Sequence, residues 1–199
     1  MVGDSVGGQI RFQSARVAAL AVLALLALSP AAPGQGAAPN SWRQDGKGVA
    51  NAPNMASSGD FAIMQVATTD AEKLISDWET PTAGANVATS ERMARNQPIV
   101  TFIIFQGCKP DASGNCNVTV DYDTTGPSGK LYDHSASVPV WVGYPAAPQG
   151  RLQLSASGYG LRIEDTDPLG AYLVRATVTD HVANITLKTQ AVLTAVAAK

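Results

Sequence analysis

Each of the two histidines in the chain follows an aspartate, a pairing that suggests general acid–base chemistry. His134 follows Asp133, and His181 follows Asp180. A histidine exchanges protons near neutral pH, and a carboxylate can orient its ring for that role. Adjacent residues of a strand point to opposite faces, however, so neither aspartate is well placed to hold the histidine next to it. We therefore interpret both histidines as loop residues rather than catalytic ones.

The sequence shows no nucleophile to complete such a pair. Its serines lie at no recognisable spacing from a base and a third partner. The P-loop, H-E-x-x-H and C-x-x-C motifs are all absent from the sequence. These observations favour a protein with no catalytic residues, no enzymatic activity and no cofactor.

Three carboxylates crowd into a stretch of four residues, at Glu164, Asp165 and Asp167. Calcium prefers oxygen ligands of this kind, so the cluster is a candidate for a weak calcium site. The alternative is a solvated turn in which aspartate side chains accept hydrogen bonds from the backbone. We favour the turn, and the sequence therefore predicts no metal-ligating residues.

Two further metal patterns are weaker still. The stretch from Asp121 to Gly126 resembles the start of a calcium loop, but the twelfth position holds Tyr132 instead of glutamate. We interpret it as a strand end and a turn. A copper site would have to use residues without a ligand spacing, namely Met64, Met93, His134 and His181.

The two cysteines, Cys108 and Cys116, enclose the turn-forming stretch KPDASGN. Zinc sites usually need four ligands, and redox pairs favour C-x-x-C, so neither alternative fits well. In an exported protein such a pair persists as a disulfide. We therefore predict a disulfide that closes a hairpin loop and contributes about 2.5 kcal/mol in the chain-entropy account.

The first residues have the order of a secretory signal. Arg11 and Arg16 precede an uncharged apolar run, Val17–Leu28, and small residues follow it. The run is 12 residues long, whereas a membrane-spanning helix needs about 20. We predict a signal peptide over residues 1–31, a periplasmic or secreted location, and no membrane span after cleavage.

Composition limits the remaining classes. The 199 residues suit one domain of ordinary size, and 45% hydrophobic with 15% charged residues can fill a core. The formal net charge is −2. The chain therefore lacks the basic character that phosphate recognition requires, and we expect no nucleic-acid partner.

Residues 32–59 are rich in alanine, proline, glycine, asparagine and serine, so we expect a flexible linker there. A β-sandwich domain is predicted over residues 60–199. Near its start, Thr69–Glu72 fits a capping box. Apolar residues at helical spacing follow and predict a short helix to about Glu79: Ala71, Leu74, Ile75 and Trp78.

Beyond this helix the hydrophobic period becomes that of strands. Ile99–Phe105 is nearly all apolar, which predicts a central strand. Apolar and polar residues alternate in later segments, including Val118–Tyr122, Val138–Val142 and Tyr172–Val178. Seven or eight such strands, separated by turns over about 100 residues, predict an all-β antiparallel sandwich with one short N-terminal helix.

The segment Asp165–Tyr172, which ends in D-P-L-G-A-Y, resembles the D-x-G-x-Y corner of immunoglobulin-like domains. In that corner the hydroxyl of a tyrosine at the start of a strand bonds the preceding backbone. The resemblance implies a Greek-key, immunoglobulin-like sandwich. With F-x-G-C at 105–108 and G-N-C at 114–116, the chain is similar to small exported bacterial proteins of unassigned function. It departs from true immunoglobulin domains because its cysteines lie too close in sequence to join the two sheets.

We expect the chain to be a non-catalytic module that binds a protein partner in the bacterial periplasm or cell envelope. The candidate surface combines the loop Gly126–Ser137 with the turn Pro145–Gly150. Aromatic anchors dominate many interfaces, so Trp141 and Tyr144 are its candidate contacts. Strict alternation would place Trp141 on the face opposite Val140.

Two alternative functions remain open from the sequence. One is an accessory protein of the envelope that binds calcium or copper. The other is a carbohydrate-binding accessory protein, for which aromatic side chains stacked on one face would be needed. The candidates for such a face are Trp141, Tyr144 and Tyr159.

Overall fold

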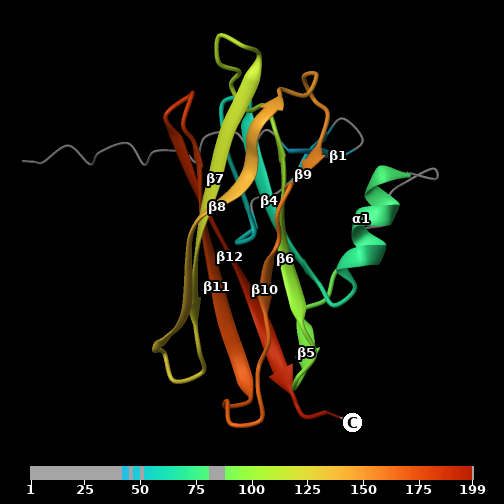
Figure 1. Cartoon of the computed structure of the whole chain (residues 1–199), viewed down its shortest axis with the longest axis vertical. Helices are drawn as coiled ribbons and strands as arrows, with labels where there is room; N and C mark the ends of the chain where they lie inside the picture. The colour runs from blue at the N-terminus through green and yellow to red at the C-terminus, as the bar shows by residue number, and fades with distance from the viewer. Residues whose placement is uncertain (1–41, 45–46, 50–51, 81–87, 199) are drawn as a thin grey trace, which may run out of the picture. The chain divides into compact units, whose positions relative to one another are not determined.

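Two five-stranded β-sheets form the fold, and one short helix lies outside them (Figure 1). The computed structural model describes residues 42–44, 47–49, 52–80 and 88–198. The predicted all-β class with one N-terminal helix is confirmed for this part of the chain. The signal peptide predicted for residues 1–31 lies outside the described residues. No helix among the described residues is long and apolar enough to cross a membrane.

Sheet 1 has the strand order β10-β6-β4-β3, and β9 also pairs with β6. All its ladders are antiparallel. Its strands are β3 (Met55–Ser58), β4 (Phe61–Thr68), β6 (Ile99–Gln106), β9 (Gln153–Leu154) and β10 (Tyr159–Leu161).

Sheet 2 has the order β5-β12-β11-β7-β8. The β5 strand runs parallel to β12, and the other ladders are antiparallel. The strands are β5 (Arg92–Ala94), β7 (Asn115–Thr125), β8 (Leu131–Pro145), β11 (Gly170–Asp180) and β12 (Ile185–Val196). Two shorter strands, β1 (Arg43–Gln44) and β2 (Lys47–Gly48), pair with each other.

The main core lies between the inner faces of the two sheets. The predicted alternation holds in β7 and β11, where every second residue is buried. The buried apolar residues of these strands are Val118, Val120, Tyr122, Tyr172, Val174, Ala176 and Val178. The β6 strand is central in sheet 1, as predicted, and both of its faces are covered.

A second core covers the outer face of sheet 1. There the helix α1 (Ala71–Glu79) packs its buried Leu74 over β4 and β6, and Trp42 joins the same cluster. The indole Nε1 of Trp42 donates a hydrogen bond of 3.2 Å to the carbonyl oxygen of Ile63. Figure 1 shows α1 beside sheet 1.

Ordered structure begins before Asp60, within residues 32–59, the range predicted to be a flexible linker. The β3 strand occupies part of that range and pairs with β4. The strand lies at an edge of the sheet, and its sequence, Met-Ala-Ser-Ser, has one large apolar residue. Edge strands of this composition resemble loops in sequence, because only one ladder and little side-chain burial define them.

Helix α1 ends at Glu79 as predicted, but its N-cap is one residue later than the capping box implied. The Oδ1 atom of Asp70 accepts a hydrogen bond of 3.0 Å from the Lys73 backbone N–H. Thr68 Oγ1 accepts one of 3.1 Å from the Asp70 N–H. Aspartate caps helices at least as well as threonine does, so the chain uses Asp70 in place of Thr69.

The predicted loop from Gly126 to Ser137 is largely a strand. A short turn over residues 126–130 leads directly into β8, which begins at Leu131. This correction has a physical cause. The β8 strand lies at the edge of sheet 2 and is exposed along most of its length. Its polar composition therefore resembles that of a loop.

A tyrosine corner begins β11. The hydroxyl of the buried Tyr172 donates a hydrogen bond of 2.7 Å to the carbonyl oxygen of Pro168. Gly170 has a φ of +131°, and a Cβ there would lie 3.4 Å from the Pro127 side chain. The positive φ explains the glycine in the D-P-L-G-A-Y segment.

Replacing Tyr172 with phenylalanine should lower the free energy of unfolding by about 0.5–1.5 kcal/mol, because the part-buried hydrogen bond to the Pro168 carbonyl is lost. The measurement is the urea midpoint. Tyr144→Phe is the matched control, since Tyr144 is 50% exposed and its hydroxyl makes no hydrogen bond with the described residues. Equal urea midpoints for the two variants would contradict a stabilising role for the hydrogen bond between Tyr172 and Pro168.

Candidate functional site

The predicted disulfide between Cys108 and Cys116 is present, with a Cα–Cα distance of 6.0 Å. It closes the loop between β6 and β7. Inside that loop, Asp111 Oδ1 accepts hydrogen bonds from the backbone N–H groups of Ser113 and Asn115, at 2.8 and 3.0 Å. The loop is thus shaped by its own turn residues as well as by the covalent bond.

Asp180 has a structural role rather than a role beside His181. Its carboxylate is 0% exposed. The Oδ2 atom accepts a hydrogen bond of 2.8 Å from Lys109 N–H, and Oδ1 accepts two of 3.0 Å from Val182 and Ala183. Three backbone donors thus occupy this carboxylate, which joins the disulfide loop to the turn between β11 and β12.

The two histidines lie apart. His134 Nδ1 is 2.8 Å from Asp123 Oδ1 on the neighbouring strand, and both side chains are about half exposed. His181 Nε2 is 2.8 Å from Thr119 Oγ1. Asp123 and Thr119 are four residues apart on β7, so the two contacts are separated by about 13 Å along the strand. The histidines do not converge on one site.

The carboxylates at 164–167 also fail to converge. Asp167 Oδ2 accepts hydrogen bonds from the Tyr132 hydroxyl and the Glu164 N–H, at 2.7 and 2.8 Å. The Tyr132 hydrogen bond is the main cause of a lowered Asp167 pKa. Asp165 Oδ1 accepts one of 2.9 Å from Asn96 Nδ2. These contacts match a turn in which aspartates serve as hydrogen-bond acceptors.

Among the described residues, no group of three or more histidine, cysteine or acidic side chains is arranged to hold a metal ion. The set considered for copper is scattered. Met93 lies in the main core on β5 and His134 on β8, which are opposite edges of sheet 2. Met64 packs in the second core, on the outer face of sheet 1.

The side chain of Tyr159 is buried and connects the two sheets, so it is not part of an exposed aromatic face. It is 5% exposed, and its ring stacks on Tyr122 with a centroid distance of 4.6 Å. Its hydroxyl donates to Asp133 Oδ2 at 2.6 Å and lies 2.8 Å from Thr124 Oγ1. Burial is the main cause of its raised pKa. The pattern of the sequence did not reveal this contact, because its members come from three strands.

Trp141 and Trp78, from distant parts of the chain, line one groove between α1, β8 and β9. We call it the aromatic groove, and its volume is about 320 Å³. Its apolar walls are Ile75, Trp78, Phe102, Trp141 and Leu154. Its polar lining includes Glu79, Gln153 and Ser155. Within the described residues, nothing donates a hydrogen bond to the side chain of Glu79 or Gln153.

A β-bulge turns Trp141 inward and corrects the expectation that it opposes Val140. Val118 pairs with Trp141 and Thr119 with Pro139, so Val140 is an extra residue on β8. The Trp141 ring centroid lies 5.7 Å from that of Phe105, in the core, and 5.0 Å from that of Tyr144, which is 50% exposed. The Trp141 Nε1–H donates a hydrogen bond of 2.9 Å to Pro145 O. The indole is therefore held in one orientation at the surface.

The segment around Ser155 accounts for the position of Trp141, which belongs to sheet 2 and yet lies near α1. Ser155 N–H donates to Ile103 O and Ile103 N–H to Ser155 Oγ, at 2.8 and 3.1 Å. Ala156 N–H donates to Val140 O at 2.8 Å. This segment thus joins β6 of sheet 1 to β8 of sheet 2, and Trp141 lies beside it.

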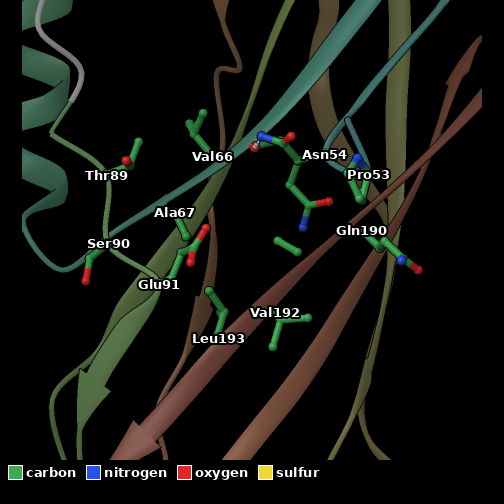
Figure 2. Close-up of a pocket in the computed structure, with 12 residues that line it drawn as sticks. Pro53, Asn54, Val66, Ala67, Thr89, Ser90, Glu91, Gln190, Val192 and Leu193 are labelled. Carbon is green, nitrogen blue, oxygen red and sulfur yellow. Dashed lines mark hydrogen bonds between the residues drawn. The ribbon is translucent and has the colours of Figure 1, made fainter. Parts of the chain in front are cut away.

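A second cavity, the lateral opening, lies between β4 and β12 and has a volume of about 330 Å³. Two chain segments frame it (Figure 2). On one side, Pro53 O accepts a hydrogen bond of 2.9 Å from Gln190 N–H. On the other, Ser90 N–H donates to Ala67 O at 2.8 Å, and Thr194 N–H to Glu91 O at 2.7 Å. These bonds fix the frame to both sheets.

Gln65 lines the inner end of the lateral opening and is 1% exposed. Its Nε2 donates a hydrogen bond of 3.3 Å to Val174 O, and its Oε1 accepts one of 2.9 Å from Thr189 Oγ1. Asn54 Nδ2 donates to Gln65 O at 3.0 Å. Nothing in the local sequence singles out Gln65, because the partners of its side chain are more than 100 residues away.

Comparisons with known proteins assign no family to this chain. No family model matches, and no curated protein matches. Among solved structures, a Niemann-Pick type C2 protein from Japanese carpenter ant is 8% identical, with 53% of this chain and 79% of that chain covered and a TM-score of 0.36. A family 123 glycoside hydrolase from Clostridium perfringens is 11% identical, covering 68% and 27% of the two chains, with a TM-score of 0.35. Neither similarity is close enough to support an argument.

Asp180→Ala should lower the free energy of unfolding by about 3 kcal/mol, because three backbone donors lose a buried charged acceptor. Chemical denaturation followed by circular dichroism measures the change. Asp60→Ala is the control, since that exposed side chain makes no hydrogen bond with the described residues, and its effect should stay within about 0.5 kcal/mol. Similar losses in the two variants would show that the contacts of Asp180 contribute nothing.

Protein from an oxidising compartment should contain no free thiol. The double variant Cys108→Ser, Cys116→Ser should lose about 2.5 kcal/mol of stability, as the loop-closure account predicts. Thiol titration of the denatured protein and urea unfolding provide the two measurements. Two titratable thiols in protein taken from an oxidising compartment would contradict the assignment.

Proposed function

We propose that the chain is an exported, non-catalytic binding module that recognises a protein partner in the bacterial periplasm or cell envelope. Its proposed contact surface is the aromatic groove together with Tyr144. One observation carries this proposal. Trp78 of α1 and Trp141 of β8, from different parts of the fold, line the same groove, and Tyr144 stands half exposed beside it.

The groove has the composition of an interaction hot spot. Tryptophan and tyrosine are enriched among residues that contribute most to binding, and they act best in preformed pockets with a polar rim. Trp141 is held by Phe105 and by Pro145 O, so little conformational entropy remains to be lost on binding. Ile75, which is 39% exposed, adds exposed apolar surface at the groove. A partner therefore gains apolar contact without first ordering this surface.

The lining of the groove also limits the chemistry of the partner. Its size suits one or two bulky apolar side chains, and Glu79 is its one charged lining residue. The whole chain carries a formal net charge of −2. We therefore propose a partner segment that combines an apolar anchor with a nearby basic residue or an unpaired backbone N–H group.

Export and an immunoglobulin-like Greek-key topology belong to the same proposal. The Cys108–Cys116 disulfide supports an oxidising compartment. The Tyr172 corner supports a relationship to immunoglobulin-like sandwiches and to the small exported bacterial proteins that carry a similar D-P-x-G-x-Y segment. The expectation that the signal peptide is cleaved after residue 31 remains part of this proposal.

A carbohydrate is the alternative occupant of the groove. Aromatic rings stack on sugar rings, while side chains such as Glu79 and Gln153 can accept hydrogen bonds from sugar hydroxyls. The alternative keeps the same site and predicts a different ligand. The experiment that follows separates the two.

The test places a photo-crosslinking amino acid at Tyr144 in the native host. We expect one protein adduct of defined mass, and Trp78→Ala should reduce its yield about tenfold because the apolar anchor loses its wall. The matched control carries the crosslinker at Leu131, at the opposite end of β8 and 65% exposed. Purified variants are first shown to keep the parental urea midpoint.

Three results would overturn or redirect the proposal. No adduct at Tyr144, or an equal adduct at Leu131, contradicts a partner site at the groove. An unchanged adduct in the Trp78→Ala protein contradicts the role of the groove itself. Saturable binding of envelope polysaccharide that Trp78→Ala removes, without a protein adduct, favours the carbohydrate alternative.

A further inference from the structure

The lateral opening is separate from the aromatic groove, and no residue lines both cavities. Its walls are the edges of β4 and β12, whereas the groove lies between α1, β8 and β9. A ligand in the opening would therefore leave the proposed partner surface free.

The opening carries one charge and several hydrogen-bond acceptors. Glu91 is its one ionisable lining residue, and neither lysine nor arginine lines it. Figure 2 shows Glu91 beside Ala67, across the opening from Pro53 and Gln190. The carboxylate is exposed, and no described residue donates a hydrogen bond to it. An anionic ligand would meet uncompensated repulsion here, whereas a cation would gain a partner.

The inner end of the opening is polar and buried. Gln65 Oε1 accepts one hydrogen bond, from Thr189, and an amide oxygen can accept two. Asn54 uses its Nδ2 atom on the Gln65 backbone, which leaves its Oδ1 atom without a donor among the described residues. A ligand with several donors and no acceptor would match these oxygens.

Apolar side chains line the space between the carboxylate and these amides. Ala67, Val192 and Leu193 contribute hydrocarbon surface on the β4 and β12 sides. A volume of about 330 Å³ is within the usual range for small-ligand sites and admits an aliphatic stem as well as a polar head. Hydrocarbon walls with acceptors at both ends suit a flexible chain that ends in an ammonium group.

From these features we propose that the lateral opening binds a primary alkylammonium group on a short aliphatic stem. Glu91 pairs with the charge, and the amide oxygens of Gln65 and Asn54 accept hydrogen bonds from donors of the ligand. Two sources share this chemistry: a lysine side chain of a partner protein and a free diamine.

The test is a titration of the full folded chain, followed by NMR and calorimetry, with three probes. The probes are 1,4-diaminobutane, Nα-acetyl-lysine methylamide and Nα-acetyl-norleucine methylamide, which has an aliphatic side chain without the ammonium group. We expect saturable binding of an ammonium probe, with shifts of the Gln65 side-chain amide resonances. The norleucine probe should not produce them. Tighter binding of the diamine indicates a free small molecule, and tighter binding of the lysine probe indicates a protein side chain.

Glu91→Gln should lower the affinity for the ammonium probes about tenfold, because it removes the charge-assisted contact and keeps the shape of the side chain. Glu72→Gln, on the exposed face of α1, is the matched control and should leave the affinity unchanged. Trp78→Ala should also leave it unchanged, which distinguishes this site from the aromatic groove. Absence of saturable binding, equal binding of the norleucine probe, or unchanged affinity in a folded Glu91→Gln protein would overturn the inference.

Discussion

The polar groups that Gln65 and Tyr159 carry into the space between the two sheets need hydrogen-bond partners there, and this requirement fixes how the sheets meet. Leaving such a group unpaired costs about 1–3 kcal/mol. Gln65 meets the requirement by joining β4 to Val174 on β11 and Thr189 on β12. Tyr159 meets it by joining β10 to Thr124 on β7 and Asp133 on β8. The two sets tie different pairs of strands, so a slip of one sheet past the other would break at least one of them.

Once the sheets are held in this way, the positions of the connecting segments follow. The Ser155 segment can bond to β6 and β8 together only because the two strands keep a fixed separation. That segment brings Trp141 to the side of the fold where α1 packs, and so creates the aromatic groove. The frame of the lateral opening depends on the same separation, since Pro53 and Glu91 bond to β12 while their neighbours bond to β4. Both cavities therefore depend on the separation of the sheets that the hydrogen bonds in the core maintain.

The sequence predicted what local patterns determine. Strands with strict alternation, such as β7 and β11, and the end of the helix at Glu79 were correctly located, because burial of one face leaves a repeating signal. The disulfide followed from two cysteines around a turn. What the patterns missed depends on distant contacts or on edges. The first half of β8, up to Ser137, was taken for a loop, whereas Val138–Val142 was correctly predicted as a strand. The bulge at Val140 reversed the direction expected for Trp141, and Tyr159 proved buried.

The distribution of exposed apolar surface is the reason why we place the proposed partner site in one groove rather than across the face of a sheet. The outer face of sheet 1 is already covered by α1 and Trp42. The outer face of sheet 2 carries charged, strongly hydrated side chains such as Asp121, Arg175 and Lys188. Neither face therefore offers a broad apolar area to a partner. The aromatic groove is a place where apolar side chains of α1 and β8 come to the surface together, because the bulge at Val140 holds Trp141 beside α1. Affinity at such a site depends on a few aromatic contacts, so the identity of one anchoring side chain on the partner can decide specificity.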